Sequence, residues 1–347
     1  YPITPASPVL EGLSHLKKFG IKCVQAEDEI AAMGVALGAS FAGDLTVCAT
    51  SGPGMCLKSE FIGLASITEL PLIICNVQRG GPSTGLPTKT EQSDLLQALF
   101  SRHGDCPLPV IAAHSPSDCF DCAIEAARIA LTYMTPVILL SDLYVANGAE
   151  PWRVPNVSDL PVIENSFAST EEEYVIYRRN KETLARSQAI PGQVGLEHRI
   201  GGLEKGEDGG VSYDPDNHEE MSLVRAQKVA RISKTLDPIH IQGESEGDLL
   251  VIGWGGTYGA ISSASRNLRD EGFSISNIHL RHLNPLPDDL GEIMSRFKKV
   301  IVPELNLGQL NVILRAKYLV DVISYGKLQG KPFKVAELHE KFLEYLR

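Results

Sequence analysis

The sequence predicts an α/β protein with two domains, each built on a parallel sheet. Short apolar runs alternate with helical patterns from about residue 22 to 147, and the same alternation resumes at 248 after a charged stretch. The length of 347 residues is sufficient for two hydrophobic cores. We therefore predict a first domain at 1–150, a charged connector with its own helix packed on that domain at 151–235, and a smaller α/β domain at 236–347.

The first domain is predicted to be a doubly wound parallel sheet. Its candidate strands are "KCVQAE" (22–27), "LTVCATS" (45–51), "PLIICNVQR" (71–79), "LPVIAAH" (108–114) and "TPVILLSD" (135–142). Helical patterns separate them at 29–43, 57–69 and 117–134, and small residues in these helices allow close packing on the sheet.

The connector and the second domain follow in order. The connector holds the charged run "EEEYVIYRRNKE" (171–182) and a polar helix with an apolar stripe at 216–236. In the second domain we predict strands at 248–255, 275–283, 298–305 and 320–326, with helices at 261–272, 288–297 and 310–319.

Composition and charge exclude several classes of protein. Hydrophobic residues make up 43% and charged residues 22%, which is typical of a globular protein in water. The net charge is −11 and no basic stripe is present, so nucleic acid is not an expected partner. The sequence contains neither an apolar run of about 18 residues nor a signal-peptide pattern, and we expect a cytoplasmic protein.

Two short motifs are interpreted as structural. The seven cysteines lie mostly in apolar runs, and Cys119 and Cys122 have no second pair to complete a metal site, so we expect them on a helix capped by Ser117 or Asp118. "GWGGTYG" (253–259) lacks the G-x-G-x-x-G spacing of a dinucleotide loop. We predict a tight strand-to-helix turn there.

A carboxylate at a helix N-terminus is the first candidate for chemistry. Glu29 follows a predicted strand and precedes Gly38 by nine residues, and "TSGPG" (50–54) ends the next strand in a turn that exposes backbone N–H groups. Glu27 and Asp28 compete for the role, and a solvated helix cap is the alternative interpretation. The step to Gly38 favours Glu29.

A second group of candidates lies in "QRGGPSTGLPTKTEQSDL" (78–95). Arg79 directly follows an apolar strand at the carboxyl edge of the sheet, where α/β proteins bind ligands. Its planar guanidinium suits a carboxylate, and Thr88 offers a hydroxyl. The alternative interpretation is a flexible polar loop. Thr4, between two prolines in "YPITPASP", is a further stiffly held hydroxyl.

Together, "YPITPAS", "AEDEIAAMGVALGAS", "TSGPGMCLKSE", the 78–95 motif and "VPELNLGQL" resemble the α subunit of the 2-oxoacid:ferredoxin oxidoreductases, closest to the 2-oxoglutarate type. The resemblance spans essentially the whole chain. It implies a pyrimidine-type thiamine-diphosphate-binding domain followed by a transketolase C-terminal-like domain. The implied reaction is oxidative decarboxylation of 2-oxoglutarate with coenzyme A to succinyl-CoA and CO₂, with electrons passed to ferredoxin.

The resemblance also implies roles for individual residues. Glu29 matches the acid that bonds the aminopyrimidine ring of the cofactor and favours its imino tautomer, which removes the thiazolium proton. The cofactor-binding turn corresponds to Ser51, Gly52, Pro53 and Gly54. Arg79 and Thr88 match residues that hold the substrate's carboxylate and keto groups, and Thr4 faces the same substrate. The resemblance assigns no role to Lys58, Glu91 or Gln92.

The missing half of the site implies a partner. The sequence lacks the G-D-G and Asn motif that binds diphosphate and Mg²⁺, since "EDGG" (207–210) has no strand before it, and its cysteines do not supply a [4Fe–4S] cluster. We expect a β subunit with these groups, in a heterodimer or its dimer. The family also carries a γ domain for subunit assembly and coenzyme A handling, as a separate chain or fused ahead of Tyr1, and the start without Met suggests that this region was removed or not included.

Three alternatives stay open at this point. The first is a pyruvate, branched-chain or indolepyruvate oxidoreductase of the same chemistry. The second is a non-redox thiamine enzyme such as a transketolase or decarboxylase, and the third is a binding or structural paralogue without activity.

Overall fold

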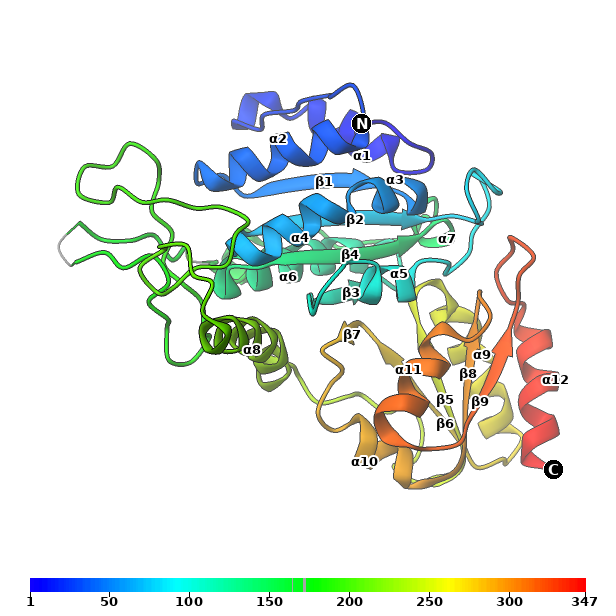
Figure 1. The fold of residues 1–347 in the computed structure, drawn as a ribbon. Helices are drawn as coiled ribbons and strands as arrows, with labels where there is room; N and C mark the ends of the chain where they lie inside the picture. Colours follow the sequence, from blue (N-terminus) through cyan, green and yellow to red (C-terminus); the bar gives the residue numbers. More distant parts are fainter. Residues whose placement is uncertain (164, 171–172) are drawn as a thin grey trace.

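Two β-sheets, one mainly in each half of the chain, organise the protein (Figure 1). The computed structural model describes residues 1–163, 165–170 and 173–347. The first sheet has the order β1-β2-β4-β3-β7, and its bounds are β1 Thr46–Thr50, β2 Leu72–Gln78, β4 Pro136–Asp142, β3 Val110–Ala112 and β7 His282–Asn284. The second has the order β6-β5-β8-β9, with bounds β6 Ile275–Leu280, β5 Gly247–Trp254, β8 Phe297–Glu304 and β9 Val322–Gly326.

All strand pairs are parallel except β3 with β7, which confirms the predicted α/β class. The helices of the first half are α1 Ser7–Ser14, α2 Glu29–Phe41, α3 Gly52–Leu57, α4 Ser59–Thr68, α5 Leu95–Phe100, α6 Asp118–Tyr133 and α7 Leu143–Ala146. Those that follow are α8 Pro215–Arg231, α9 Tyr258–Asp270, α10 Leu290–Ser295, α11 Gln309–Tyr318 and α12 Val335–Leu346.

Helices cover both faces of the first sheet. Successive side chains of β2 point to opposite faces, so Ile74 joins the core beneath α2 and α4, while Ile73 packs with α6. The doubly wound arrangement follows, and it places the carboxyl ends of β1 and β2 beside the start of α2.

The two halves share one hydrophobic core. Leu250 and Ile252 of β5 belong to the same buried cluster as Ile74, whereas Leu249 and Val251 face α9 and α12. Strand β7 strengthens the connection, because it lies between β6 and β8 of the second sheet in sequence but pairs with β3 of the first. The relative position of the halves is therefore fixed by packing and by backbone hydrogen bonds.

Two strand predictions need correction. Lys22–Glu27, which the structure describes in full, forms no strand: Val24 is 57% exposed and no strand of the described residues pairs with this segment. The predicted strand at 275–283 is divided into β6 and β7, which belong to different sheets and are separated by Arg281. Both errors arise because sequence periodicity does not identify the neighbouring strand.

The structure confirms the helix predicted for Cys119 and Cys122 and the turn predicted at 253–259, but not a side-chain cap on that helix. Cys119 and Cys122 are free thiols in the first turns of α6, and Ser117 is the N-cap residue although its side chain makes no capping bond. Asp118 is the first helical residue and accepts the backbone N–H of His114 instead. Gly255, with φ of 55°, makes the tight turn from β5 through a short 3₁₀ helix into α9.

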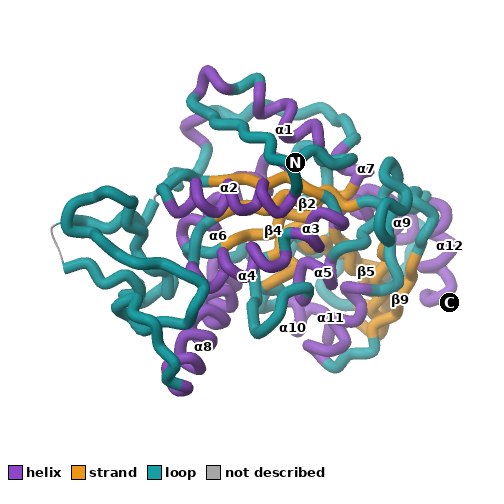
Figure 2. The backbone as a smooth tube through the Cα atoms, turned by 45° about the horizontal axis from the view of Figure 1, so that its top comes forward, coloured by secondary structure: helices purple, strands orange, loops and turns teal. Residues whose placement is uncertain are grey.

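The connector consists largely of loop before α8 (Figure 2). Residues 164, 171 and 172 of this predicted region, including the first two of "EEEYVIYRRNKE", lie outside the described residues. Helix α8 contacts the first half through Lys228, which donates to Glu69 at 2.5 Å and to the carbonyl of Met134 at 2.9 Å. The exact domain boundaries stay a prediction. Among the described helices, none is long and apolar enough to cross a bilayer.

Replacing Glu69 by Gln is expected to lower the free energy of unfolding by about 3–5 kcal/mol at pH 7, because Lys228 is left buried without its counter-ion. Burial opposes ionisation of Glu69, but the charges of Lys228 and Arg179 lower its pKa to about 2. The stabilisation is therefore complete above the unfolded pKa of about 4.3 and is lost as pH falls towards 2. Denaturant unfolding across this range measures it, and equal stability of variant and wild type at pH 7 contradicts the prediction.

Candidate active site

Three consecutive acids precede α2, and the structure gives each a different place. Glu27 is exposed, and Asp28 is the N-cap residue, whose carboxylate accepts the N–H of Ala31 at 2.7 Å. Glu29 is the first helical residue and only 8% exposed. Its carboxylate makes no hydrogen bond to any described residue. Among the three, Glu29 alone has the burial and the free carboxylate that a cofactor-binding acid requires.

The turn after β1 lies directly against Glu29. A Cβ on Gly54 would lie 2.1 Å from Thr50 Oγ1 and 3.1 Å from Glu29 Cγ, so this position accepts no side chain. A Cβ on Gly52 would lie 2.9 Å from Asp94 Oδ1. Ser51 between β1 and α3 is fully buried, and its hydroxyl has no hydrogen-bond partner among the described residues. Gly52 therefore packs against the Asp94 carboxylate, and Gly54 packs against the Glu29 side chain. We call the surface formed by these two glycines the Gly54 cradle.

Gly38, whose spacing favours Glu29 in the sequence, makes no close packing contact within the described chain. A Cβ on Gly38 would meet nothing within 4 Å, and the residue is exposed. Gly34 is the glycine of α2 that permits close packing, since its Cβ would lie 3.2 Å from Cζ of Phe61 on α4. The nine-residue step from Glu29 therefore leads to a surface position of this chain.

Arg79 and Thr4 lie together, although they are 75 residues apart. Arg79 follows β2, is 7% exposed, and donates from Nη1 to the backbone carbonyl of Thr4 at 2.5 Å. The Arg79 Nε is buried without a partner in the described part of the chain. The Thr4 hydroxyl is not used in this contact, and Thr4 itself is exposed. Ala6 is buried and anchors this N-terminal segment, while Ile3 is partly exposed.

Thr88 lies in the exposed loop that follows Arg79 in the sequence. The loop is closed by backbone hydrogen bonds between Gly80 and both Leu86 and Lys89. Within the described residues, Thr88 makes no hydrogen bond to Arg79 or Thr4. The proximity of Thr4 and Arg79 is thus a structural finding, whereas the role of Thr88 stays a prediction.

Asp94 and Gln92 belong to the site, although the sequence does not identify them as site residues. Asp94 is 7% exposed, accepts Asn76 Nδ2 at 3.0 Å, and has its pKa raised by burial. Gln92, which was given no role, joins the two halves: its side chain donates to the carbonyl of Trp254 at 2.7 Å and accepts from the N–H of Leu305 at 2.8 Å. Both residues lie in the motif at 78–95, which follows a buried strand, but the partners of Gln92 lie about 160 and 210 residues away.

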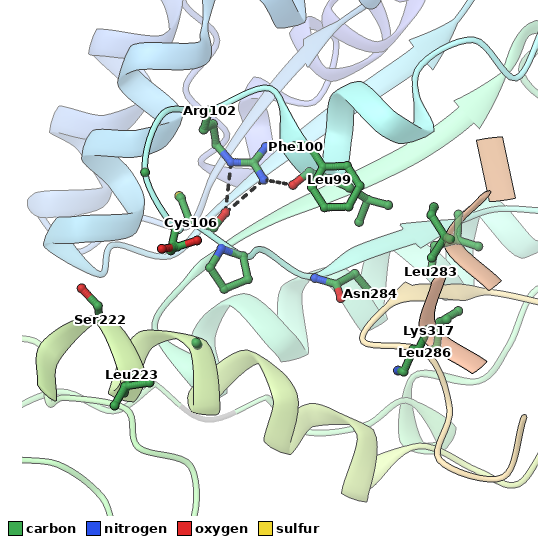
Figure 3. A pocket seen from close by; sticks show the side chains of 15 residues that line it. Leu99, Phe100, Arg102, Cys106, Ser222, Leu223, Leu283, Asn284, Leu286 and Lys317 are labelled. Atoms are coloured by element: carbon green, nitrogen blue, oxygen red, sulfur yellow. Dashed lines mark hydrogen bonds between the residues drawn. The ribbon is translucent and has the colours of Figure 1, made fainter. Parts of the chain in front are cut away.

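A separate cavity of about 490 Å³ opens between α8, α11 and the loop after α5 (Figure 3). Arg102 lines it, but its guanidinium is already bonded to the carbonyls of Ala98, Leu99 and Cys106. None of Glu29, Ser51, Gly54 and Arg79 lines this cavity. These four residues are instead buried at the carboxyl ends of β1 and β2 and at the start of α2.

The residues present fit one half of a cofactor site. Of the buried polar atoms that lack partners among the described residues, Ser51 Oγ, Asn76 Oδ1 and Arg79 Nε come from the carboxyl ends of β1 and β2. Gly52 and Gly54 let the backbone of this turn approach Asp94 and Glu29 more closely than any side chain would permit. In the described ranges, no cluster of three His, Cys, Asp or Glu side chains is arranged to hold a metal ion.

Comparison with known proteins identifies the class. Residues 1–210 match the family described as "Pyruvate flavodoxin/ferredoxin oxidoreductase, thiamine diP-bdg". The chain belongs to this family, which contains the thiamine-diphosphate-binding domain expected from Glu29 and the "TSGPG" turn.

Two proteins that are similar to this chain carry 2-oxoglutarate in their names. The 2-oxoglutarate oxidoreductase subunit KorA of Mycobacterium tuberculosis is 53% identical over 97% of this chain and 52% of that protein. The 2-oxoglutarate synthase subunit KorA of Methanocaldococcus jannaschii is 34% identical over 99% of this chain and 93% of that protein. The chain thus spans about half the length of the M. tuberculosis relative.

A solved structure agrees closely with the fold. It is described as 2-oxoglutarate:ferredoxin oxidoreductase from Magnetococcus marinus with 2-oxoglutarate, coenzyme A and succinyl-CoA bound. The TM-score is 0.96 and the identity 38%, over 100% of this chain and 61% of that one.

Proposed function

We propose that this chain is the α-type part of a 2-oxoacid:ferredoxin oxidoreductase that converts 2-oxoglutarate and coenzyme A to succinyl-CoA and CO₂, with electrons passed to ferredoxin. The observation that carries the proposal is Glu29, a largely buried residue that packs against Gly54 and whose carboxylate is bonded to no described residue, in a chain of the thiamine-diphosphate-binding family. The names of the similar proteins support 2-oxoglutarate as the substrate.

In this proposal each residue has a defined task. Thiamine diphosphate, when bound, would supply the nucleophilic carbon for chemistry at the keto group of a 2-oxo acid. Glu29 holds a proton at the ring nitrogen of the aminopyrimidine, while Ser51, Gly52, Pro53 and Gly54 form the surface on which that ring rests.

Arg79 orients the substrate in the same proposal. Its guanidinium is fixed by the carbonyl of Thr4 and still has Nε and Nη2 available for a carboxylate. The hydroxyls of Thr4 and Thr88 are assigned to the substrate side of this site.

Exposed apolar side chains beside the site support the presence of a partner subunit. Apolar side chains near the start of α2 and the end of α3 are exposed: Val24 57%, Ile30 46%, Val35 47% and Leu57 50%. A β subunit that covers them brings the diphosphate and Mg²⁺ site and the [4Fe–4S] cluster, and a γ domain contributes to assembly and coenzyme A handling. We place the complex in the cytoplasm.

The test is a substrate panel on the chain assembled with its partner subunit. Reduction of ferredoxin or a viologen dye is expected to require both a 2-oxo acid and coenzyme A, with the highest kcat/KM for 2-oxoglutarate. A higher value for pyruvate, a branched-chain 2-oxo acid or indolepyruvate contradicts the substrate. Absence of electron transfer with every substrate contradicts the reaction class.

A further inference from the structure

A fully buried lysine lies next to the proposed cofactor acid. Lys58 joins α3 to α4, has no exposed surface, and donates from Nζ to the backbone carbonyl of Glu29 at 2.9 Å. The Cys48 thiol on β1, the Glu29 carboxylate and the Asp28 carboxylate all act on the ammonium group. Lys58 therefore connects the first turn of α2 to the segment that carries the Gly54 cradle.

The position of this charge is electrostatically unfavourable for the fold alone. A cation at the N-terminus of α2 opposes the helix dipole, and an ammonium group loses hydration when it is buried. Burial lowers the pKa of Lys58 from 10.5, and the Cys48 thiol and the Glu29 carboxylate act against that shift. A methionine of similar length would fill the same space without this cost.

The other buried lysines have a structural explanation that Lys58 lacks. Lys228 pairs with Glu69, and Lys205 donates to the carbonyl of Ile67 at 2.7 Å near the C-terminus of α4. A cation is favourable at that end of a helix. Lys58 precedes the opposite end of α4, and Glu29 is the buried carboxylate that acts on its charge.

We propose that Lys58 is a positioning residue for Glu29, which fixes the first turn of α2 and balances the charge of the free carboxylate beside the Gly54 cradle. The inference rests on the proposed function of Glu29. Because no described residue bonds that carboxylate, its position depends on the tie between Lys58 and the Glu29 carbonyl and on packing against Gly54. Loss of the tie lets the carboxylate move, and positioning at this scale controls binding and catalysis.

The test compares Lys58→Met with Lys205→Met in the chain assembled with its partner subunit. Thiamine diphosphate affinity is measured by calorimetry in the presence of Mg²⁺, the imino tautomer of the bound cofactor by near-ultraviolet circular dichroism, and Tm by thermal unfolding. For Lys58→Met we expect about tenfold weaker cofactor binding and a reduced imino band, with Tm unchanged or raised. For Lys205→Met we expect a lower Tm with wild-type cofactor affinity and band.

Wild-type affinity and an undiminished imino band in Lys58→Met overturn the proposal. If that variant does not fold, Lys58→Gln, which retains a donor without the charge, decides by the same two criteria. A parallel measurement on Glu29→Gln separates the two hypotheses. If Glu29→Gln loses the imino band and Lys58→Met does not, only the role of Lys58 fails; if Glu29→Gln also retains it, the proposed function of Glu29 fails.

Discussion

Replacing Glu29 by Gln is expected to lower turnover of the assembled enzyme with a 2-oxo acid by about 10²- to 10⁴-fold, the usual contribution of a positioned acid or base. The amide has nearly the same shape and preserves the packing against Gly54, but it does not exchange a proton with the ring nitrogen of the cofactor. Steady-state dye reduction at saturating cofactor measures the effect.

The matched control for Glu29 is Glu27→Gln. Glu27 is an acid two residues away that is exposed and has no hydrogen-bond partner among the described residues. We expect wild-type turnover from this variant. Full activity of Glu29→Gln, or an equal loss in both variants, contradicts the assignment of Glu29.

Replacing Arg79 by Lys is expected to raise KM for the 2-oxo acid by about 10- to 100-fold, with thiamine diphosphate affinity unchanged. Lysine keeps the positive charge but does not present two parallel donors to a carboxylate, and it does not span the carbonyl of Thr4 and the substrate together. A charge-assisted hydrogen bond contributes about 1.5–3 kcal/mol, which corresponds to this range. Initial rates over a range of 2-oxo acid concentrations measure it.

Thr4→Val separates the two parts of this contact. The valine keeps the backbone carbonyl that receives the Arg79 hydrogen bond and removes only the hydroxyl. A smaller rise in KM than in Arg79→Lys is expected. An unchanged KM in Arg79→Lys contradicts the role of Arg79 in substrate binding.

Much of the fold could be predicted because its core strands are uniformly apolar. Leu72–Gln78 and Pro136–Asp142 are buried on both faces, so their sequences are continuous hydrophobic runs with polar residues where the strands end. The same property made Arg79 recognisable as a ligand-binding candidate at the carboxyl edge of the sheet.

The errors arose where the deciding contact is distant in sequence. Lys22–Glu27 has the alternation of a strand but no neighbouring strand to pair with. Arg281 lies in an apolar pattern, yet the chain passes there from one sheet to the other, and its guanidinium pairs with Asp118. Periodicity describes which residues are buried, but it does not say against what.

The candidate site also combines residues that the sequence identifies with residues that only the structure identifies. Glu29 could be separated from Glu27 and Asp28 by spacing to Gly38, but the structure separates them by burial and capping, and Gly38 takes no part in the packing. The sequence assigns no role to Lys58, because complete burial of a lysine is not visible in a sequence.

We propose that this chain supplies only the pyrimidine half of a thiamine diphosphate site. Calorimetric titration of the cofactor with Mg²⁺, into the chain alone and into the chain assembled with its partner subunit, tests that claim most directly. We predict one cofactor per chain in the assembled complex and no measurable binding to the chain alone. Tight binding by the isolated chain, or none in the complex, would contradict it.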